Sequence, residues 1–207
     1  MATMIRINCQ SNWLPATYVA IDEAMLLFCG RSEDIVKMKN KPIEEGFKIW
    51  VLVDLGYVYN WLWFSGHKKK GTEVIGKKNW KYQINNKGAT ASFAPTFAVI
   101  IYLAQLLTAL FNRVFVLVLD NLFLNVEVAQ ALLLLNIAYC GTTRKNTSGF
   151  LPDLIKIKEH NRLYLWDSCI ARIIDKVLYF IWQDNNTILG VTIVYSLRGA
   201  RPFDSVK

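Results

Sequence analysis

Residues 114–121 read VFVLVLDN, and this run is the strongest indicator of the fold in the chain. An unbroken apolar run rich in valine predicts a β-strand, and this one looks the most buried in the chain. Asp120 closes the apolar run, and Asn125 follows at a position that suits the N-cap of a helix. A buried strand that passes into a helix in this way is typical of α/β proteins.

The neighbouring segments alternate between helix patterns and strand patterns. An apolar stretch at residues 93–111 carries Pro95, which is tolerated in the first turn of a helix, and residues 125–135 predict a second helix. The other predicted strands are residues 17–28, 46–54, 56–65 and 137–143. The tight turn at residues 54–56 (DLG) predicts a hairpin. This order predicts an α/β fold in which helices flank a mixed sheet.

After Arg144 the sequence changes to short β-like runs separated by polar turns. These runs, at residues 163–166, 169–174, 177–182 and 187–195, predict a small antiparallel β-rich region. We therefore expect a lead-in at 1–16, a core at 17–146, a β-rich insertion region at 147–200 and a tail at 201–207. The first fifteen residues and the segment 31–42 are polar and predict irregular structure.

Composition indicates an intracellular globular protein. Hydrophobic residues are 53% of the 207 and charged residues 19%, so a sizeable core can be buried and global disorder is excluded. The chain start lacks the pattern of a signal peptide, and the scattered cysteines indicate reduced thiols rather than a zinc site or disulfides. Residues 93–111 contain no charge and approach the length of a membrane span. Because Pro95 and Gln105 interrupt them, a buried helix is the favoured interpretation.

The positive charge of the chain is concentrated in one segment. The formal net charge is +8, and residues 67–88 contribute six of these charges. Lysines in this segment that could contact phosphates are Lys68, Lys69, Lys70, Lys77 and Lys78. The alternative interpretation is a solvated surface loop without a ligand.

Two aspartates follow apolar β-like runs, and they are the candidate catalytic residues. Asp22 follows the run at residues 17–21, and Asp120 follows the run at 114–119. Two carboxylates on neighbouring strands are what a divalent-metal site for phosphoryl transfer requires. Each carboxylate could instead cap a turn or a helix. Glu23 points to the opposite face by strand alternation, and Asp54 fits a simple role in the hairpin turn.

Several motifs in one consistent order resemble the piggyBac transposase family, and fungal members most of all. They are IDEAM at 21–25, GRS at 30–32, NKP at 40–42, GFKIW at 46–50, LDNLF at 119–123 and CGTTRKN at 140–146. The resemblance covers nearly the whole chain, from Tyr18 to Leu197. It implies an RNase H-like fold for residues 17–146.

The resemblance also implies a chemistry. Asp22 and Asp120 match the first two catalytic aspartates, which hold Mg²⁺ or Mn²⁺ for cleavage and strand transfer at DNA phosphodiesters. The third family carboxylate lies on a late helix, and this sequence matches none; Asp204 sits in a polar tail. We therefore expect a catalytically impaired, truncated core.

The resemblance further implies DNA, at transposon ends, as a partner and a nuclear location. A homodimer and the absence of membrane association are separate expectations. Arg31, Arg144 and Lys145 are expected to contact DNA near the two aspartates. A non-catalytic remnant that acts as a structural or interaction protein, or a decaying gene fragment, is the alternative interpretation.

Overall fold

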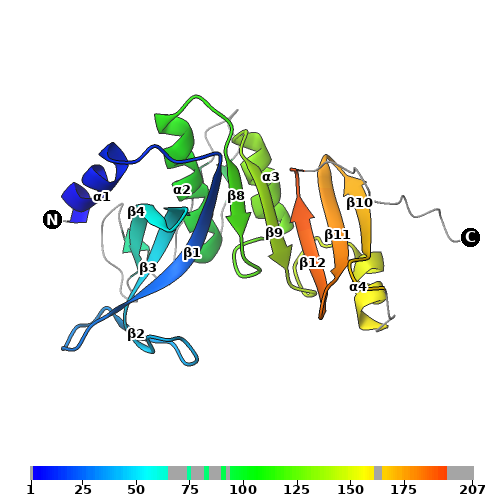
Figure 1. Cartoon of the computed structure of the whole chain (residues 1–207), viewed down its shortest axis with the longest axis horizontal. Coiled ribbons are helices and arrows are strands. Elements are labelled where there is room, and N and C mark those ends of the chain that lie inside the picture. The colour runs from blue at the N-terminus through cyan, green and yellow to red at the C-terminus, as the bar shows by residue number, and fades with distance from the viewer. Residues whose placement is uncertain are drawn as a thin grey trace, which may run out of the picture. The chain divides into compact units, whose positions relative to one another are not determined.

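The computed structural model describes residues 2–64, 74–75, 82–83, 90–91, 94–160 and 165–194. The chain divides into two compact units, Met1–Phe115 and Val116–Lys207. The first unit contains α1 (Ala2–Ser11), β1 (Tyr18–Leu27), β2 (Ile35–Lys37), β3 (Glu45–Asp54), β4 (Tyr57–Phe64), β5 (Val74–Ile75), β6 (Tyr82–Gln83), β7 (Thr90–Ala91) and α2 (Pro95–Leu110) (Figure 1). The second contains β8 (Val116–Leu119), α3 (Val126–Leu134), β9 (Ala138–Thr143), α4 (Pro152–Glu159), β10 (Cys169–Ile174), β11 (Val177–Gln183) and β12 (Thr187–Thr192).

The first unit is built on a mixed sheet in which β3 is central. β3 pairs antiparallel with β1, β4 and β2, and β5 extends the sheet parallel to β4. The predicted hairpin is confirmed, because Asp54 pairs with Tyr57 across a two-residue turn. Leu55 and Gly56 have φ of +48° and +85°, and positive φ at both central residues is the mark of a type I′ turn.

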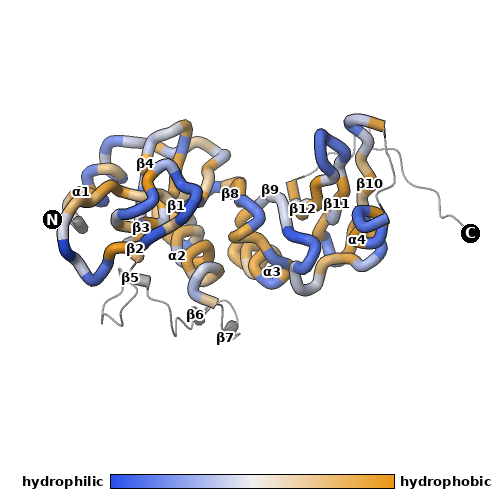
Figure 2. Tube along the Cα trace, turned by 90° about the horizontal axis from the view of Figure 1, so that it is seen from below, coloured by the Kyte–Doolittle hydropathy of each residue, from blue (hydrophilic) through white to orange (hydrophobic). Residues whose placement is uncertain are grey.

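Helices α1 and α2 both contact β4 in the first unit. Pro95 starts α2, as expected, and residues such as Ile101, Leu103 and Leu107 are fully buried. The hydrophobic colour covers most of α2 and α3 (Figure 2). The buried helix predicted at residues 93–111 is therefore confirmed from Pro95 onward. Among the described residues, no helix has both the length and the apolar character needed to cross a membrane.

The second unit is a mixed sheet in the order β10-β11-β12-β9-β8. β8 runs parallel to β9, whereas β12 pairs antiparallel with β9, and β11 and β10 continue antiparallel. Helix α3 contacts β9 and β12, and α4 contacts β11. The predicted β-rich segment thus extends the sheet that begins with β8. The domain boundaries expected from the sequence stay predictions.

Three local predictions were wrong. Residues 2–11 form α1 rather than an irregular lead-in, β2 lies within the expected 31–42 loop, and the helix α4 lies within the 147–200 region, for which only short β-like runs were predicted. Contacts distant in sequence hold α1: the Tyr57 hydroxyl donates to the Cys9 carbonyl at 3.0 Å, and the guanidinium of Arg6 lies over the Trp61 ring. Such tertiary contacts override weak local preference.

The expected strand at 163–166 is not formed at Leu165 and Trp166, which lead into a turn before β10. The other half of that prediction, residues 163–164, lies outside the described residues.

Candidate functional site

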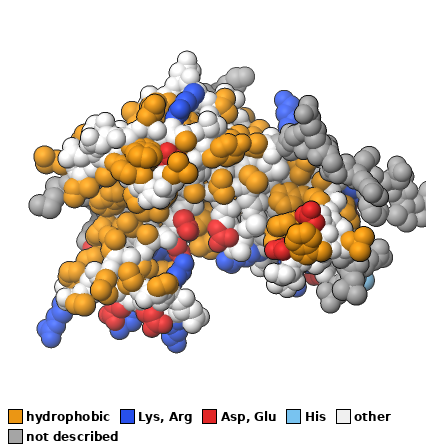
Figure 3. Space-filling model, in the orientation of Figure 1, with side chains coloured by type: hydrophobic (Ala, Val, Ile, Leu, Met, Phe, Trp, Pro, Cys, Tyr) orange, Lys and Arg blue, Asp and Glu red, His pale blue; other side chains and the backbone are white. Residues whose placement is uncertain are grey.

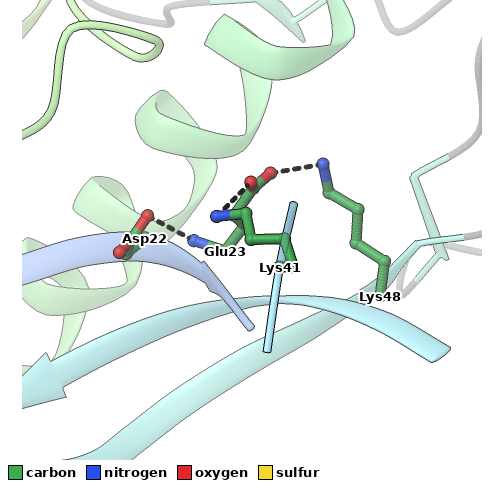
Figure 4. A network of polar contacts seen from close by, with 4 residues as sticks. All are labelled: Asp22, Glu23, Lys41 and Lys48. Carbon is green, nitrogen blue, oxygen red and sulfur yellow. Dashed lines mark hydrogen bonds and ion pairs between the residues drawn. The ribbon is translucent and has the colours of Figure 1, made fainter. Parts of the chain in front are cut away.

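Asp22 lies in the middle of β1, opposite Val51 of β3. Its neighbour Ile21 is 1% exposed, so strand alternation turns the Asp22 side chain outward, where it is exposed. The expectation of a carboxylate at the end of a buried strand was wrong here, because β1 continues to Leu27. The Oδ1 atom of Asp22 accepts a hydrogen bond from the Glu23 backbone N–H at 2.7 Å, which fixes the orientation of the carboxylate (Figure 4).

By strand alternation the Glu23 side chain lies on the face of β1 opposite to Asp22. Two lysines hold it there (Figure 4). Lys48 Nζ lies 2.6 Å from Glu23 Oε2, and Lys41 Nζ lies 2.9 Å from Glu23 Oε1. The Glu23 side chain is 8% exposed and that of Lys48 is 12% exposed. Burial raises the pKa of Glu23, but hydrogen bonds and charge attraction from Lys48 and Lys41 outweigh it, so the pKa lies below its usual value. Glu23 is therefore an anchor for two ion pairs.

Asp120 directly follows β8, at the carboxyl end of the parallel pair β8–β9. Its Oδ1 atom accepts hydrogen bonds from the Asn121 backbone N–H at 2.6 Å and from Thr142 Oγ1 at 3.4 Å. Asp120 is exposed, and so is not a desolvated strand-end charge. Asp120 and Asp22 thus share one local arrangement, in which the next residue's amide orients the carboxylate.

Gly141 allows β8 and β9 to approach closely beside Asp120. A Cβ atom at Gly141 would lie 2.2 Å from the Leu119 carbonyl oxygen, which is well inside van der Waals contact. Gly141 pairs with Leu119 in the ladder, and the next residue, Thr142, reaches Asp120. The sequence offered the glycine in its CGTTRKN motif, but only the register shows what it contacts.

Arg144 joins the polar cluster that contains Asp120. Its Nε donates to Asn121 Oδ1 at 3.2 Å, so a guanidinium lies beside the residue that follows the aspartate. Lys145 is exposed and its Nζ lies 3.7 Å from Glu159 Oε1. An exposed arginine fixed next to a carboxylate can contact a phosphate that approaches a bound cation.

The other predicted DNA contacts are less clearly placed. Arg31 lines an open depression with Ser32, Lys37 and Glu45. Figure 3 shows acidic and basic side chains intermixed at the end of the first unit that carries β2. Lys68, Lys69, Lys70, Lys77 and Lys78 lie outside the described residues.

The ligand chemistry of the two aspartates suits Mg²⁺ or Mn²⁺. Both offer exposed carboxylate oxygens, the hard ligands that these cations take, and both are oriented before any ligand binds. No group of three or more His, Cys, Asp or Glu residues within the described segments could hold a metal ion. Asp22 belongs to the first unit and Asp120 to the second, and their binding of one shared ion stays a prediction.

Sequence reasoning missed part of the environment of these aspartates and the role of Asp54. Lys41 and Lys48 lie in the NKP and GFKIW motifs, but their convergence on Glu23 needs the β1–β3 register. Asp54 does more than end the hairpin. Its Oδ2 accepts hydrogen bonds from Trp13 Nε1 and from the Ala16 N–H, each at 2.8 Å, and so holds the segment between α1 and β1.

Comparison with solved structures finds the same fold in a transposase. The piggyBac transposase, determined by cryo-EM as a synaptic complex with hairpin DNA, matches with a TM-score of 0.69 and 18% sequence identity. The match covers 94% of this chain and 36% of the transposase chain. The chain therefore shares the fold of the matched part of this transposase, and the α/β, RNase H-like fold expected from the sequence is confirmed.

The family assignment agrees with the fold. A family model described as Transposase IS4 matches residues 1–205. The chain belongs to this family of DDE-type transposases. No curated protein matches the chain.

Proposed function

We propose that this chain is a transposase-derived domain that binds DNA and holds a divalent cation with Asp22 and Asp120. One observation carries the proposal: each aspartate is exposed, and the backbone N–H of the following residue orients its Oδ1 at 2.7 or 2.6 Å. Family membership supports a metal-dependent chemistry, and the piggyBac transposase of similar fold was solved in complex with hairpin DNA. A nuclear location and a homodimeric state are further parts of the proposal.

In this proposal different residues of the chain bind the cation and contact the DNA phosphate. Asp22 and Asp120 supply the carboxylate oxygens for the cation, and Thr142 keeps Asp120 oriented. Arg144, fixed by Asn121, contacts a phosphate. In the family's full site, which has a third carboxylate, a bound divalent cation would activate the attacking oxygen and stabilise the leaving one.

We also propose that the 207-residue chain binds DNA without cleaving or joining it. The family's third carboxylate has no match in this sequence, and two carboxylates neutralise less of the cation charge than three. Incubation of the chain with hairpin and blunt duplex DNA in Mg²⁺ should yield no new strand ends or joined products on a denaturing gel. Robust strand transfer by this chain alone would contradict this part of the proposal.

DNA binding is tested by fluorescence anisotropy on a short hairpin duplex over a series of salt concentrations. Arg144→Gln should weaken binding at each salt concentration and reduce the salt slope by about 0.9, the value for one phosphate contact. The combined change of Lys68, Lys69, Lys70, Lys77 and Lys78 to Gln should flatten the slope further. Lys176→Gln, in the exposed turn between β10 and β11, is the matched control and should leave affinity and slope unchanged. Equal loss in the control and Arg144→Gln would contradict the assigned phosphate contact.

A further inference from the structure

Glu23 is the central residue of an ion-pair network that connects three segments of the first unit. It lies on β1, Lys48 lies on β3, and Lys41 lies in the connection between β2 and β3. Lys48 Nζ also lies 4.1 Å from the centroid of the Trp50 ring. The acid therefore has little freedom to move.

This network differs from an ordinary surface ion pair. The Lys37–Glu45 pair at the start of β3 has side chains that are 76% and 51% exposed, and such pairs contribute little to stability. Glu23 and Lys48 are largely buried, and removing charges from water is unfavourable unless the pairing geometry is good. Lys41 is more exposed, with 41% of its side chain accessible, so the unfavourable desolvation falls mainly on Glu23 and Lys48. A largely buried ion pair is thus a costly way to join β1 and β3, and this favours a role beyond stability.

The anchored residue is also the one that orients the candidate metal ligand. The Glu23 backbone N–H donates to Asp22 Oδ1 at 2.7 Å, and Lys41 and Lys48 fix the Glu23 side chain (Figure 4). By strand alternation that side chain lies on the face of β1 opposite to Asp22. Fixing the side chain limits rotation of the peptide group between Asp22 and Glu23. A change at either lysine can therefore reach the Asp22 carboxylate without contacting it.

We propose that Glu23, Lys41 and Lys48 are positioning residues that hold the Asp22 carboxylate in the orientation needed to bind a divalent cation. The inference rests on the proposed function, because it assigns a purpose to residues next to the candidate metal ligand. Partners of this kind behind a ligand commonly change metal affinity by about tenfold or more when they are removed.

Two variants of opposite charge separate positioning from simple charge attraction. Glu23→Gln removes a negative charge, and Lys48→Met removes a positive charge while it keeps much of the apolar stem. If the network acts only through its charge, Lys48→Met should tighten Mn²⁺ binding and Glu23→Gln should weaken it. If the network positions Asp22, both should weaken Mn²⁺ binding by about tenfold. Lys48→Arg, which can keep both the ion pair and the contact with Trp50, should restore most of the affinity.

Mn²⁺ affinity is measured by isothermal titration calorimetry of the full chain, with Mn²⁺ as the only ligand. Lys37→Met and Glu45→Gln, from the exposed Lys37–Glu45 ion pair on the same sheet, are the controls. Thermal unfolding of every variant confirms that it is folded at the titration temperature. Unchanged affinity in Glu23→Gln and Lys48→Met, or opposite effects of the two, overturns the inference while Mn²⁺ binding by the unaltered chain upholds the proposed function. Absence of Mn²⁺ binding in the unaltered chain would contradict the proposed function instead.

A second measurement tests the inference without metal. The backbone N–H of residue 23 donates a hydrogen bond to a carboxylate in the native chain. Asp22→Asn weakens this bond, so the chemical shift of the residue 23 amide proton should move upfield at constant pH. Lys48→Met and Lys41→Met should move the same proton in the same direction, whereas Lys37→Met should not. If the chemical shift of the residue 23 amide proton is unchanged in both lysine variants, the ion pairs of Glu23 do not orient Asp22 and the inference is wrong.

Discussion

Lys48 Nζ lies 2.6 Å from Glu23 Oε2, and the two side chains come from adjacent antiparallel strands that leave both largely buried. Lys41 approaches the other Glu23 oxygen from a different segment. Because Glu23 also presents its amide to Asp22, the pair connects the stability of the β1–β3 sheet to the geometry of the candidate site.

The Glu23 carboxylate should make the stability of the chain depend on acidic pH. Its pKa is lowered in the folded state, so its contribution to folding is complete above the unfolded-state pKa and is lost as pH falls through the folded pKa. Glu23→Gln should cost about 2 kcal/mol at pH 7, in the range for a hydrogen bond to a charged group. The gap in stability between the unaltered chain and the variant should close as the pH falls through the lowered pKa of Glu23.

Thermal unfolding measured from pH 3 to pH 7 checks this prediction. Glu45→Gln, which removes the exposed carboxylate of the Lys37 pair, is the control and should change the melting temperature little at any pH. A difference in melting temperature between Glu23→Gln and the unaltered chain that stays the same from pH 3 to pH 7 would show that the charge of Glu23 adds no stability.

Mn²⁺ should raise the melting temperature of the chain through Asp22 and Asp120. A ligand that binds only the folded state stabilises by about 1.4 kcal/mol at ten times its Kd, and by more at higher concentration. Asp22→Asn combined with Asp120→Asn should abolish the rise, because an amide oxygen binds a divalent cation more weakly than a carboxylate. Asp175→Asn, in an exposed turn, is the matched control. An equal rise in the double variant would place the bound metal elsewhere.

Much of the central fold could be predicted because its signals are local. A few adjacent residues are enough to determine the strand in the valine-rich run at 114–119 and the positive-φ turn at Leu55-Gly56. α4 also had local signals that were missed, with Pro152 in its first turn and basic residues in its last. α1 had none of comparable strength, since contacts such as the Tyr57–Cys9 hydrogen bond hold it.

The candidate site was predictable in its residue types and less so in its surroundings. The motifs identified Asp22 and Asp120, but alternating apolar residues alone could not show that both are exposed. The convergence of Lys41 and Lys48 on Glu23 depends on strand register, which pairs Glu23 with Trp50. Register is set by the whole sheet, so no short segment contains it.

Gly141→Ala should destabilise the chain by about 2 kcal/mol, within the range for overpacking a close contact. The new methyl group would lie 2.2 Å from the Leu119 carbonyl oxygen and also close to a Leu124 methyl carbon, at 2.9 Å. The backbone oxygen cannot move without disturbing the β8–β9 ladder. Urea unfolding should show a lower midpoint with an unchanged slope. Cys140→Ala, one residue earlier on β9, is the control for a small change on the same strand. A Gly141→Ala midpoint equal to that of the control would show that β8 and β9 can separate at no cost.

Tyr139→Phe should raise stability, although it removes a polar group from the sequence. The Tyr139 side chain is fully buried, and its hydroxyl has no hydrogen-bond partner among the described residues. Burial accordingly raises the pKa of Tyr139. A buried hydroxyl without a partner costs about 1 kcal/mol or more, and phenylalanine fills the same space without that cost.

Tyr57→Phe provides the opposite case on the same chain. The Tyr57 hydroxyl donates to the Cys9 carbonyl at 3.0 Å, so its removal should cost about 1 kcal/mol and loosen α1. Differential scanning calorimetry should therefore show a higher melting temperature for Tyr139→Phe and a lower one for Tyr57→Phe. Each shift should be about 2–4 °C for a chain of this size. A fall for Tyr139→Phe similar to that for Tyr57→Phe would indicate a buried water or a further partner at the Tyr139 hydroxyl, because only a satisfied hydroxyl stabilises the folded state.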